Sequence, residues 1–437
     1  MRDFARSDSV AVQAQLDRLA ALSVPDGRLG LETIRALLDR LGNPQRRLPP
    51  VFHVAGTNGK GSTCAFLRAM LEAEGYRVHV TTSPHLVRYN ERIRVAGELI
   101  SDQRLAAVLA EVLDAGADLN PSFFEVTIAA AFTEFARVPA DACVVEVGLG
   151  GRFDATNVLE PDVLAACGIA ALGIDHERFL LAPEEGAPEE PTARIAFEKA
   201  GIAKPGVPLV TMGSEYSESA RSQVQRVAGL VGSPLFEKLQ GWDFSIAEGE
   251  FVFFEPASEI PVYLAFPQLY GAHQVLNSGL AIAMLRSQDK IAVSLQSIGS
   301  GLQNVRWPAR LQQLGPGPLT ALCGQERVWL DGGHNPNAGE ALSRHFQSQF
   351  HLVIGMLDNK DPLALIEPLR DRLRSVTSVP VPGHSSHSRE AFGNDARAAA
   401  DVEAALRSLP DDGYPILIAG SLYLAGEVLR LNDEIPD

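Results

Sequence analysis

The sequence has few cysteines and a deficit of positive charge. Its 437 residues include four cysteines, and no two of them form a C-x-x-C pair. This spacing argues against a zinc site and a disulfide framework, so we expect reduced thiols in a cytoplasmic protein. Lys and Arg number 38 against 54 Asp and Glu, a formal charge of −16, and no basic run is longer than Arg46-Arg47. Such a chain repels a phosphodiester backbone, so we expect no nucleic-acid partner.

Long hydrophobic runs are also missing. The longest central stretch without Asp, Glu, Lys or Arg, residues 260–285, is interrupted by Pro261, Pro267 and several polar side chains. It cannot form a clean spanning helix, so we expect no membrane partner. Charged residues near the N-terminus, including Arg2 and Asp3, stand where a signal peptide needs an apolar core. Export is therefore not expected.

Length and hydropathy patterning predict an α/β protein with two domains. At roughly 150 residues per domain, the length corresponds to two or three domains. Segments that read as strands alternate with segments of helical periodicity, which is typical of a mostly parallel sheet. A hinge at 303–310 separates the predicted domains, residues 1–305 and 306–437. We expect a P-loop central domain with a mostly parallel sheet and a smaller, Rossmann-like α/β C-terminal domain.

The predicted elements follow from apolar periodicity and from glycine and proline positions. Two helices and a turn are predicted within 12–41, and further helices at 62–74, 103–115, 125–136, 193–200, 217–231 and 274–286. Strands are predicted at 51–55, 77–81, 142–147, 162–174, 208–211, 328–330, 351–354 and 415–419, with short β-segments at 242–246, 251–254 and 261–266. The strands predicted at 328–330, 351–354 and 415–419 each end in a loop that contains glycine. Ligands bind at such strand ends in open α/β sheets.

A glycine-rich segment lies between the predicted strand 51–55 and the helix after it. Backbone N–H groups and the helix N-terminus can surround a polyphosphate, Lys60 can reach its terminal phosphates, and the hydroxyl of Ser62 or Thr63 can bind Mg²⁺. The spacing departs from the general P-loop, because Gly61 separates Lys60 from Ser62. A plain glycine turn is the alternative. The predicted nucleotide-binding residues are Gly56, Thr57, Asn58, Gly59, Lys60, Gly61 and Ser62.

The loop belongs to a series of motifs that spans most of the chain. Together they resemble the Mur ligase superfamily, and more closely the family of folylpolyglutamate synthase and bifunctional dihydrofolate synthase. The motifs are GTNGKGS at 56–62, SPHLVRYNERIRV at 83–95, FFE at 123–125, EVGLGGRFDATN at 146–157, DH at 175–176, IAFEKAGI at 195–202, HQVLN at 273–277, WPAR at 307–310, DGGHNP at 331–336 and GSLYLAG at 420–426.

The resemblance implies an ADP-forming amide ligase that adds L-glutamate to dihydropteroate and to reduced folates through an acyl phosphate. ATP and Mg²⁺ at two sites are the implied cofactors, with a monovalent cation in addition, and a monomer is expected. A monofunctional folylpolyglutamate synthase is the nearest alternative. A Mur ligase would need a UDP-sugar-binding domain before the loop, and only 55 residues precede Gly56. A nucleotide-binding protein without turnover is the alternative from another class.

Metal binding is implied for donors that follow predicted strands. By resemblance, Ser83 and Glu146 bind one Mg²⁺ together with Ser62, and His176 binds a second. The resemblance also implies that Lys199 is carbamylated, which turns a cation into an oxygen ligand. On the residues alone, Ser83 fits a turn, Glu146 an exposed charge, His176 a helix cap, and Lys199 a solvated helix lysine. The predicted catalytic residues are Lys60, His176, Lys199 and Arg310.

Four further positions match nucleotide-contacting residues of the family, namely Asn277, Arg310, Asp331 and His334. A buried salt-bridge arginine and a strand-end turn are the alternatives for Arg310 and for the DGGHNP segment. Two departures affect local backbone geometry. Ala309 replaces the glycine usual in WPGR, and Gly333 replaces the frequent alanine of DGAHNP.

The acyl substrate is assigned by resemblance to aromatic and charged positions. Aromatic faces suit a flat heterocycle, and an arginine suits its carboxylate-bearing tail, although core packing is the alternative for the two phenylalanines. His334 and Ser421, at loop ends of the second domain, are candidates for binding glutamate. The chain also carries an acidic stretch at 182–191 that is longer than the family's usual connection. The predicted substrate residues are Leu29, Gly30, Ser122, Phe123, Phe124, Glu125, Arg152 and Ser421.

Overall fold

The structure is a computed structural model, and it describes residues 6–22, 30–174, 177–247, 250–255, 261–323 and 327–437. The chain forms two compact units. The first contains Met1–Ser83, Tyr89–Gln268 and Gln274–Arg306, and the second contains Pro84–Arg88, Leu269–His273 and Trp307–Asp437. The chain therefore passes between the units more than once, and two short peptides from its first two-thirds belong to the second unit.

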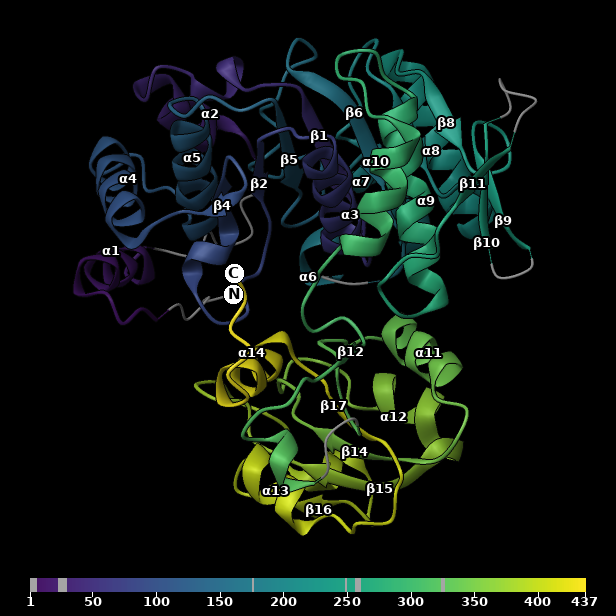
Figure 1. The fold of residues 1–437 in the computed structure, drawn as a ribbon. Coiled ribbons are helices and arrows are strands. Elements are labelled where there is room, and N and C mark those ends of the chain that lie inside the picture. The colour runs from purple at the N-terminus through teal and green to yellow at the C-terminus, as the bar shows by residue number, and fades with distance from the viewer. Residues whose placement is uncertain (1–5, 23–29, 175–176, 248–249, 256–260, 324–326) are drawn as a thin grey trace. The chain divides into compact units, whose positions relative to one another are not determined.

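An eight-stranded sheet in the order β4-β3-β2-β5-β1-β6-β7-β8 lies at the centre of the first unit (Figure 1). Strand β1 (Val51–Ala55) is parallel to β5 (Ala142–Glu146) on one side and to β6 (Leu164–Ile169) on the other. All five residues of β1 are buried, as expected of a central parallel strand covered on both faces. The other strands are β2 (Val78–Thr81), β3 (Ile93–Val95), β4 (Glu98–Leu99), β7 (Leu209–Thr211) and β8 (Leu235–Glu237).

Amphipathic helices cover this sheet. The apolar positions of the first two helices point into the same core as the sheet strands, which explains why these short segments are ordered. The helices are α1 (Val10–Ala20), α2 (Glu32–Arg40), α3 (Lys60–Ala73), α4 (Asp102–Ala115), α5 (Phe123–Phe135), α6 (Glu177–Leu180), α7 (Pro191–Ala200), α8 (Glu218–Val231), α9 (Ala272–Arg286) and α10 (Leu295–Asn304). A small antiparallel sheet, β11 (Val262–Leu264), β10 (Glu250–Phe254) and β9 (Asp243–Ala247), completes the unit.

The second unit is built on a six-stranded sheet in the order β12-β13-β17-β14-β15-β16. Its strands are parallel except for the pairing of β12 with β13. The strands are β12 (Gln312–Gln313), β13 (Val328–Leu330), β14 (Phe350–Ile354), β15 (Leu373–Ser378), β16 (Arg397–Ala398) and β17 (Ile416–Ala419). The helices are α11 (Pro336–His345), α12 (Leu363–Leu369), α13 (Val402–Ser408) and α14 (Leu422–Leu431).

The predicted α/β fold with a mostly parallel central sheet is confirmed. Some predicted bounds were wrong. The helix predicted at 62–74 begins at Lys60, and the strand predicted at 162–174 is limited to Leu164–Ile169. The sequence analysis did not predict α10 or the antiparallel edge made by β3 and β4. Across the described residues, no helix combines the length and the apolar character needed to cross a membrane.

Candidate nucleotide and substrate site

The glycine-rich loop connects the buried strand β1 to helix α3 and has a shape that requires glycine. Gly56 has φ +151° and Gly59 has φ +82°. A Cβ on Gly59 would overlap the amide of Asn277, and a Cβ on Gly56 would lie 2.9 Å from Ala170 Cβ. Because α3 begins at Lys60, the N–H groups of its first turn lack acceptors within the helix and mark this end as a site for an anion.

Two lysines donate to one carbonyl of this loop. Lys60 Nζ lies 3.1 Å from the carbonyl oxygen of Gly56, and Lys199 Nζ lies 2.9 Å from the same oxygen. Lys199, near the end of α7, is 4% exposed, so the alternative of a solvated helix lysine is wrong. Two ammonium groups at one carbonyl concentrate positive charge on the loop, which suits a bound polyanion.

Thr57 fixes the loop to the chain that follows β6. Its hydroxyl donates to the carbonyl of Gly173 at 2.8 Å, and the backbone N–H groups of Thr57 and Asn58 donate to the carbonyl of Ala171. These two N–H groups therefore hold the shape of the loop. The donors that a phosphate could use lie further on, at the start of α3.

Glu146, at the end of β5, lies next to the backbone of Ser83. Ser83 N donates to Glu146 Oε2 at 3.0 Å, so the ends of two neighbouring strands bring a carboxylate and a hydroxyl-bearing residue together. Glu146 is 5% exposed, which excludes the alternative of an exposed charge. Burial, and then the charge of Glu146, raise the pKa of the Cys64 thiol, while Lys60 lowers it. The charges of Glu146 and Lys60 are therefore both felt at Cys64, near the start of α3.

Some predicted site residues lie outside the described part of the chain, namely Leu29 and His176. Gly30 is described and lies two residues before α2, which begins at Glu32. Within the described residues, no group of three or more His, Cys, Asp or Glu side chains could hold a metal ion. A metal set drawn from described residues would thus depend on the carboxylate of Glu146, on serine hydroxyls and on a modified lysine.

Asn277 lies on α9 and is buried against the loop. Its Nδ2 donates to Gln274 Oε1 at 3.1 Å, and its Oδ1 occupies the space beside Gly59. Asn277 and Gly59 come from opposite ends of the first unit's sequence. The structure therefore joins two of the predicted nucleotide residues through a packing contact that depends on the missing side chain of Gly59.

Helix α5 opens the segment predicted to bind the acyl substrate. Ser122 and Glu125 form a capping box: Ser122 N donates to Glu125 Oε2 at 2.7 Å, and Glu125 N donates to Ser122 Oγ at 3.2 Å. Phe123 and Phe124 pack partly buried against the core, and Phe124 covers Gly148, where a Cβ would overlap its ring. The substrate role of these four residues stays a prediction, because the cap and the core account for their positions.

Arg152 is engaged by two carboxylates of the chain. Its Nε and Nη2 donate to Glu198 at 3.3 and 2.8 Å, and its Nη1 and Nη2 donate to Glu184 at 2.8 and 2.5 Å. These hydrogen bonds raise the pKa of the guanidinium, with the Glu184 bond as the largest cause. The ring of Phe197 also lies beside the guanidinium, at 4.8 Å. The sequence analysis missed Glu184 as a partner, because nothing in the acidic loop distinguishes it from its neighbours.

The second unit contributes a separate group at the carboxyl end of β13. Asp331 Oδ1 accepts from Gly333 N and Oδ2 accepts from Leu311 N, both at 2.7 Å. A Cβ on Gly333 would lie 2.7 Å from Asp331 Oδ1, so alanine would displace this carboxylate. Ala309 has φ +56°, a region that glycine adopts without strain. Leu311 has φ +48°, so Arg310 lies between two residues with left-handed backbone conformation.

His334 and Ser421 lie on adjacent loops of the same sheet edge. Gly420 N donates to the carbonyl of Gly333 at 3.1 Å, which connects the loop after β17 to the loop after β13. His334 Nδ1 lies 3.2 Å from the carbonyl of Gly332. Ser421 caps α14, and its hydroxyl accepts from Tyr423 N at 3.1 Å. The predicted residues of the second unit are thus brought together at one edge.

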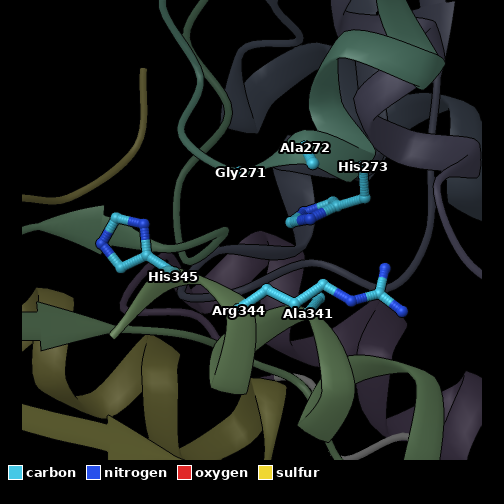
Figure 2. A pocket seen from close by; sticks show the side chains of 6 residues that line it. All are labelled: Gly271, Ala272, His273, Ala341, Arg344 and His345. Carbon is cyan, nitrogen blue, oxygen red and sulfur yellow. The ribbon is translucent and has the colours of Figure 1, made fainter. Parts of the chain in front are cut away.

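A cavity of about 220 Å³ also lies in the second unit (Figure 2). Figure 2 shows His273 and Arg344 on opposite sides of it, and burial lowers the pKa of both His273 and His345. It is smaller than the roughly 300–1,000 Å³ of most ligand pockets. Its lining residues are Gly271, Ala272, His273, Ala341, Arg344 and His345.

Comparisons with known proteins agree with this architecture. The chain is 33% identical to the dihydrofolate synthase/folylpolyglutamate synthase of Bacillus subtilis, over 92% of this chain and 94% of the relative. It is 30% identical to the dihydrofolate synthetase of Saccharomyces cerevisiae, over 93% and 98%. The structure of Escherichia coli FolC in complex with DHPP and ADP has a TM-score of 0.84 and 29% identity, covering 97% of each chain. No family model matches the sequence.

A Yersinia pestis bifunctional folylpolyglutamate synthase/dihydrofolate synthase complexed with AMPPNP and Mn ion gives a TM-score of 0.82 at 29% identity, covering 96% of this chain and 97% of that one. The glycine loop on a parallel sheet and the second α/β unit, together with the similarity to these relatives, place the chain in the class of ATP-dependent ligases. Within it, the chain belongs to the dihydrofolate synthase/folylpolyglutamate synthase family. The family resemblance in the sequence is thereby confirmed.

Proposed function

We propose that the protein joins L-glutamate to dihydropteroate and extends reduced folates with further glutamate residues. In both reactions ATP phosphorylates a carboxylate of the acceptor, and the amine of glutamate displaces phosphate from the acyl phosphate, giving an amide, ADP and phosphate. The position of Lys60 beside the Gly56 carbonyl, at the start of α3, carries the proposal, because its ammonium and the N–H groups of the first helical turn face the place where a polyphosphate would bind. The similarity to relatives bound to DHPP, ADP and AMPPNP supports it.

The chain's own residues act chiefly by positioning. Lys60 and the N-terminal turn of α3 bind the terminal phosphates of the nucleotide, and Asn277 holds the loop in place from α9. Arg310, Asp331 and His334 keep the nucleotide-contacting role that the family resemblance implies. Within the second unit Asp331 also orients the turn that carries Arg310, since its carboxylate accepts from Leu311 N.

Magnesium fits the donors at the end of β5 and the start of α3. Ser62, Ser83 and Glu146 would hold one ion, and His176 with a carbamate on Lys199 would hold the other. The ions would neutralise the charge on the phosphoryl group during transfer. Burial of Lys199 at 4% exposure supports the carbamate, because a buried ammonium repels Mg²⁺ whereas a carbamate offers oxygen ligands.

The deciding experiment is ADP release by the purified protein with MgATP and L-glutamate, compared between dihydropteroate, tetrahydrofolate and no acceptor. We expect turnover with both acceptors and its loss in Lys60→Ala, while Lys290→Ala, a change at an exposed lysine outside the site, retains it. Turnover with tetrahydrofolate alone would indicate a monofunctional folylpolyglutamate synthase. No turnover with either acceptor would overturn the proposal.

Mass spectrometry of the intact protein prepared with bicarbonate tests the carbamate on Lys199.

A further inference from the structure

A four-residue charge network ties the long acidic loop to helix α7. Glu184, in that loop, accepts from Arg152 and, at 2.7 Å, from Arg194 Nη2. Arg194 Nε also donates to the carbonyl of Leu180 at 3.0 Å, and Arg194 pairs with Glu198 at 3.2 Å. The network therefore contains two arginines and two glutamates, and its formal charges cancel.

The two carboxylates on Arg152 differ in burial. The side chain of Glu198 is 3% exposed, whereas that of Glu184 is 39% exposed. Glu198 is also fixed by the fold, because it belongs to α7 and its backbone carbonyl accepts from Arg152 N at 2.8 Å. Glu184 lies on a surface loop, where its backbone carbonyl accepts only from the nearby Ala187 N, at 3.3 Å, among the described residues. It is the more accessible of the two carboxylates, so it is the partner that a carboxylate from solution can reach and replace.

Glu184 occupies the end of the guanidinium that best recognises a carboxylate. It takes both terminal nitrogens, Nη1 and Nη2, in the bidentate arrangement typical of arginine–carboxylate pairs. These hydrogen bonds lower the pKa of Glu184 to about 2, so its carboxylate is ionised at neutral pH. Removing its charge would leave two arginines with one buried carboxylate, which is a net positive site.

The loop that contains Arg152 also packs against residues to which the proposed function gives a role in the reaction or in substrate binding. A Cβ on Gly151, the residue before it, would lie 2.7 Å from the Glu198 carbonyl oxygen and 3.0 Å from the backbone of Lys199. Gly148, four residues earlier, packs under the ring of Phe124. The loop that carries Arg152 therefore contacts both Phe124, in the segment proposed to bind the acyl substrate, and Lys199.

We propose that Glu184 is a specificity-determining residue, whose carboxylate competes with a non-reacting carboxylate of the acyl substrate for the guanidinium of Arg152. The proposal rests on the proposed function. Dihydropteroate has one carboxylate, the one that reacts. A folate extended through its γ-carboxylate also bears a free α-carboxylate, which needs a cationic partner. Glu184 therefore selects against glutamylated acceptors and leaves dihydropteroate unaffected.

The test compares Glu184→Gln with Glu185→Gln, which removes the same charge from a neighbouring exposed position of the loop. Dissociation constants for tetrahydrofolate and dihydropteroate are measured by isothermal titration calorimetry, with KM values from ADP release alongside. In Glu184→Gln we expect tetrahydrofolate to bind about threefold to tenfold more tightly, and dihydropteroate to change less than twofold. Glu185→Gln should leave both constants unchanged, and Glu184→Asp should resemble the parent protein.

Equal changes for both acceptors, no change for either, or weaker tetrahydrofolate binding in Glu184→Gln would overturn the proposal. The same effect in Glu185→Gln would also overturn it, because the cause would then be the general charge of the loop. Thermal melting checks that each variant is folded. Absence of ADP release by the parent protein would contradict the proposed function, whereas the calorimetric comparison still decides the role of Glu184.

Discussion

At the scale of single residues, Gly59 shows how one absent side chain shapes the site. We expect Gly59→Ala to weaken binding of a non-hydrolysable ATP analogue at least tenfold, because the new Cβ would overlap Asn277 and push the loop from the start of α3. The left-handed φ adds about 1–2 kcal/mol of strain. Gly75, just beyond the end of α3, is the control, since its φ is +93° and its Cβ would meet open space.

Gly75→Ala should lower the free energy of unfolding through backbone strain alone and should leave the affinity for the nucleotide unchanged. Calorimetric titration measures the affinity, and urea unfolding measures the strain in both variants. Equal affinities in the two variants would show that Gly59 matters only for its φ, and that the contact with Asn277 is incidental.

His53 predicts a pH dependence of stability. It is fully buried in β1 with Nε2 2.8 Å from Thr156 Oγ1, and burial, followed by the charge of Lys204, lowers its pKa to about 3. The folded state therefore binds fewer protons than the unfolded state between pH 6.5 and 3. The free energy of unfolding should fall as the pH drops below 6.5, by at most about 1.4 kcal/mol per pH unit from this group.

His53→Gln should reduce that slope, measured by urea unfolding between pH 7.5 and 5. The slope should not vanish, because burial lowers the pKa of His79 and His273 with the same sign. Carboxylates whose pKa is lowered, such as Glu190, lose their contribution only below about pH 4.5 and do not interfere in this window. Parallel profiles for the variant and the parent protein would contradict the assignment.

The residue-scale predictions from sequence depended on chemistry and on motif order. Lys60 and Glu146 could be chosen because a glycine loop and a strand end each restrict where a side chain can go. The burial of Lys199 could not be predicted, since a lysine near a helix end is usually solvated and only packing against Gly56 reverses this. The partners of Arg152 could not be predicted either, because ion pairs between distant segments leave no local pattern.

At the scale of elements, the capping box of α5 separates a structural role from a binding role. Ser122→Ala should lower the free energy of unfolding by about 1 kcal/mol, because it removes the N-cap acceptor for Glu125 N. Ser101→Ala removes the equivalent acceptor for Arg104 N at the start of α4 and should cost a similar amount. Only Ser122→Ala should raise the KM for dihydropteroate, since Ser122 is in the proposed acyl-substrate segment. An unchanged KM would remove Ser122 from that segment.

Elements were predictable where the pattern was strong and local. Strands β1 and β5 are short segments made mostly of apolar residues, and they were placed almost to the residue. Helix α10 was missed because its sequence, LQSIGSGLQN, is rich in glycine and serine, which are weak helix formers. Tertiary packing stabilises it: a Cβ on Gly301 would lie 2.6 Å from the backbone of Met70 in α3, so the glycine permits close contact between the two helices.

At the scale of the whole molecule, the second unit depends on peptides far away in sequence. Gly426 on α14 lies against the carbonyl of Leu86, which a Cβ would overlap. We expect Gly426→Ala to destabilise the protein by about 2 kcal/mol or more, although alanine is the better helix former. Gly229 is exposed on α8 with open space around it, so Gly229→Ala should stabilise by about 1 kcal/mol. Urea unfolding compares the two, and stabilisation by both would show that the segment containing Leu86 yields without cost.

The hinge in the sequence near 303–310 coincides with the main passage from Arg306 to Trp307. The assignment of Pro84–Arg88 and Leu269–His273 to the second unit was not predictable, because it rests on tertiary contacts. Leu86 packs against the core of that unit, and the rings of Tyr270 and Trp329 are 5.3 Å apart.

This discontinuity limits how the gene can be recombined. A fragment that starts at Trp307 would lack Leu86, which packs against its core, and Tyr270, whose ring contacts Trp329. A chimaera made by exchanging only the C-terminal third with a relative would bring foreign helices against native inserts that did not evolve with them. A functional exchange has to carry three separate stretches of coding sequence, so this unit is inherited as a set of segments and cannot move as a single cassette.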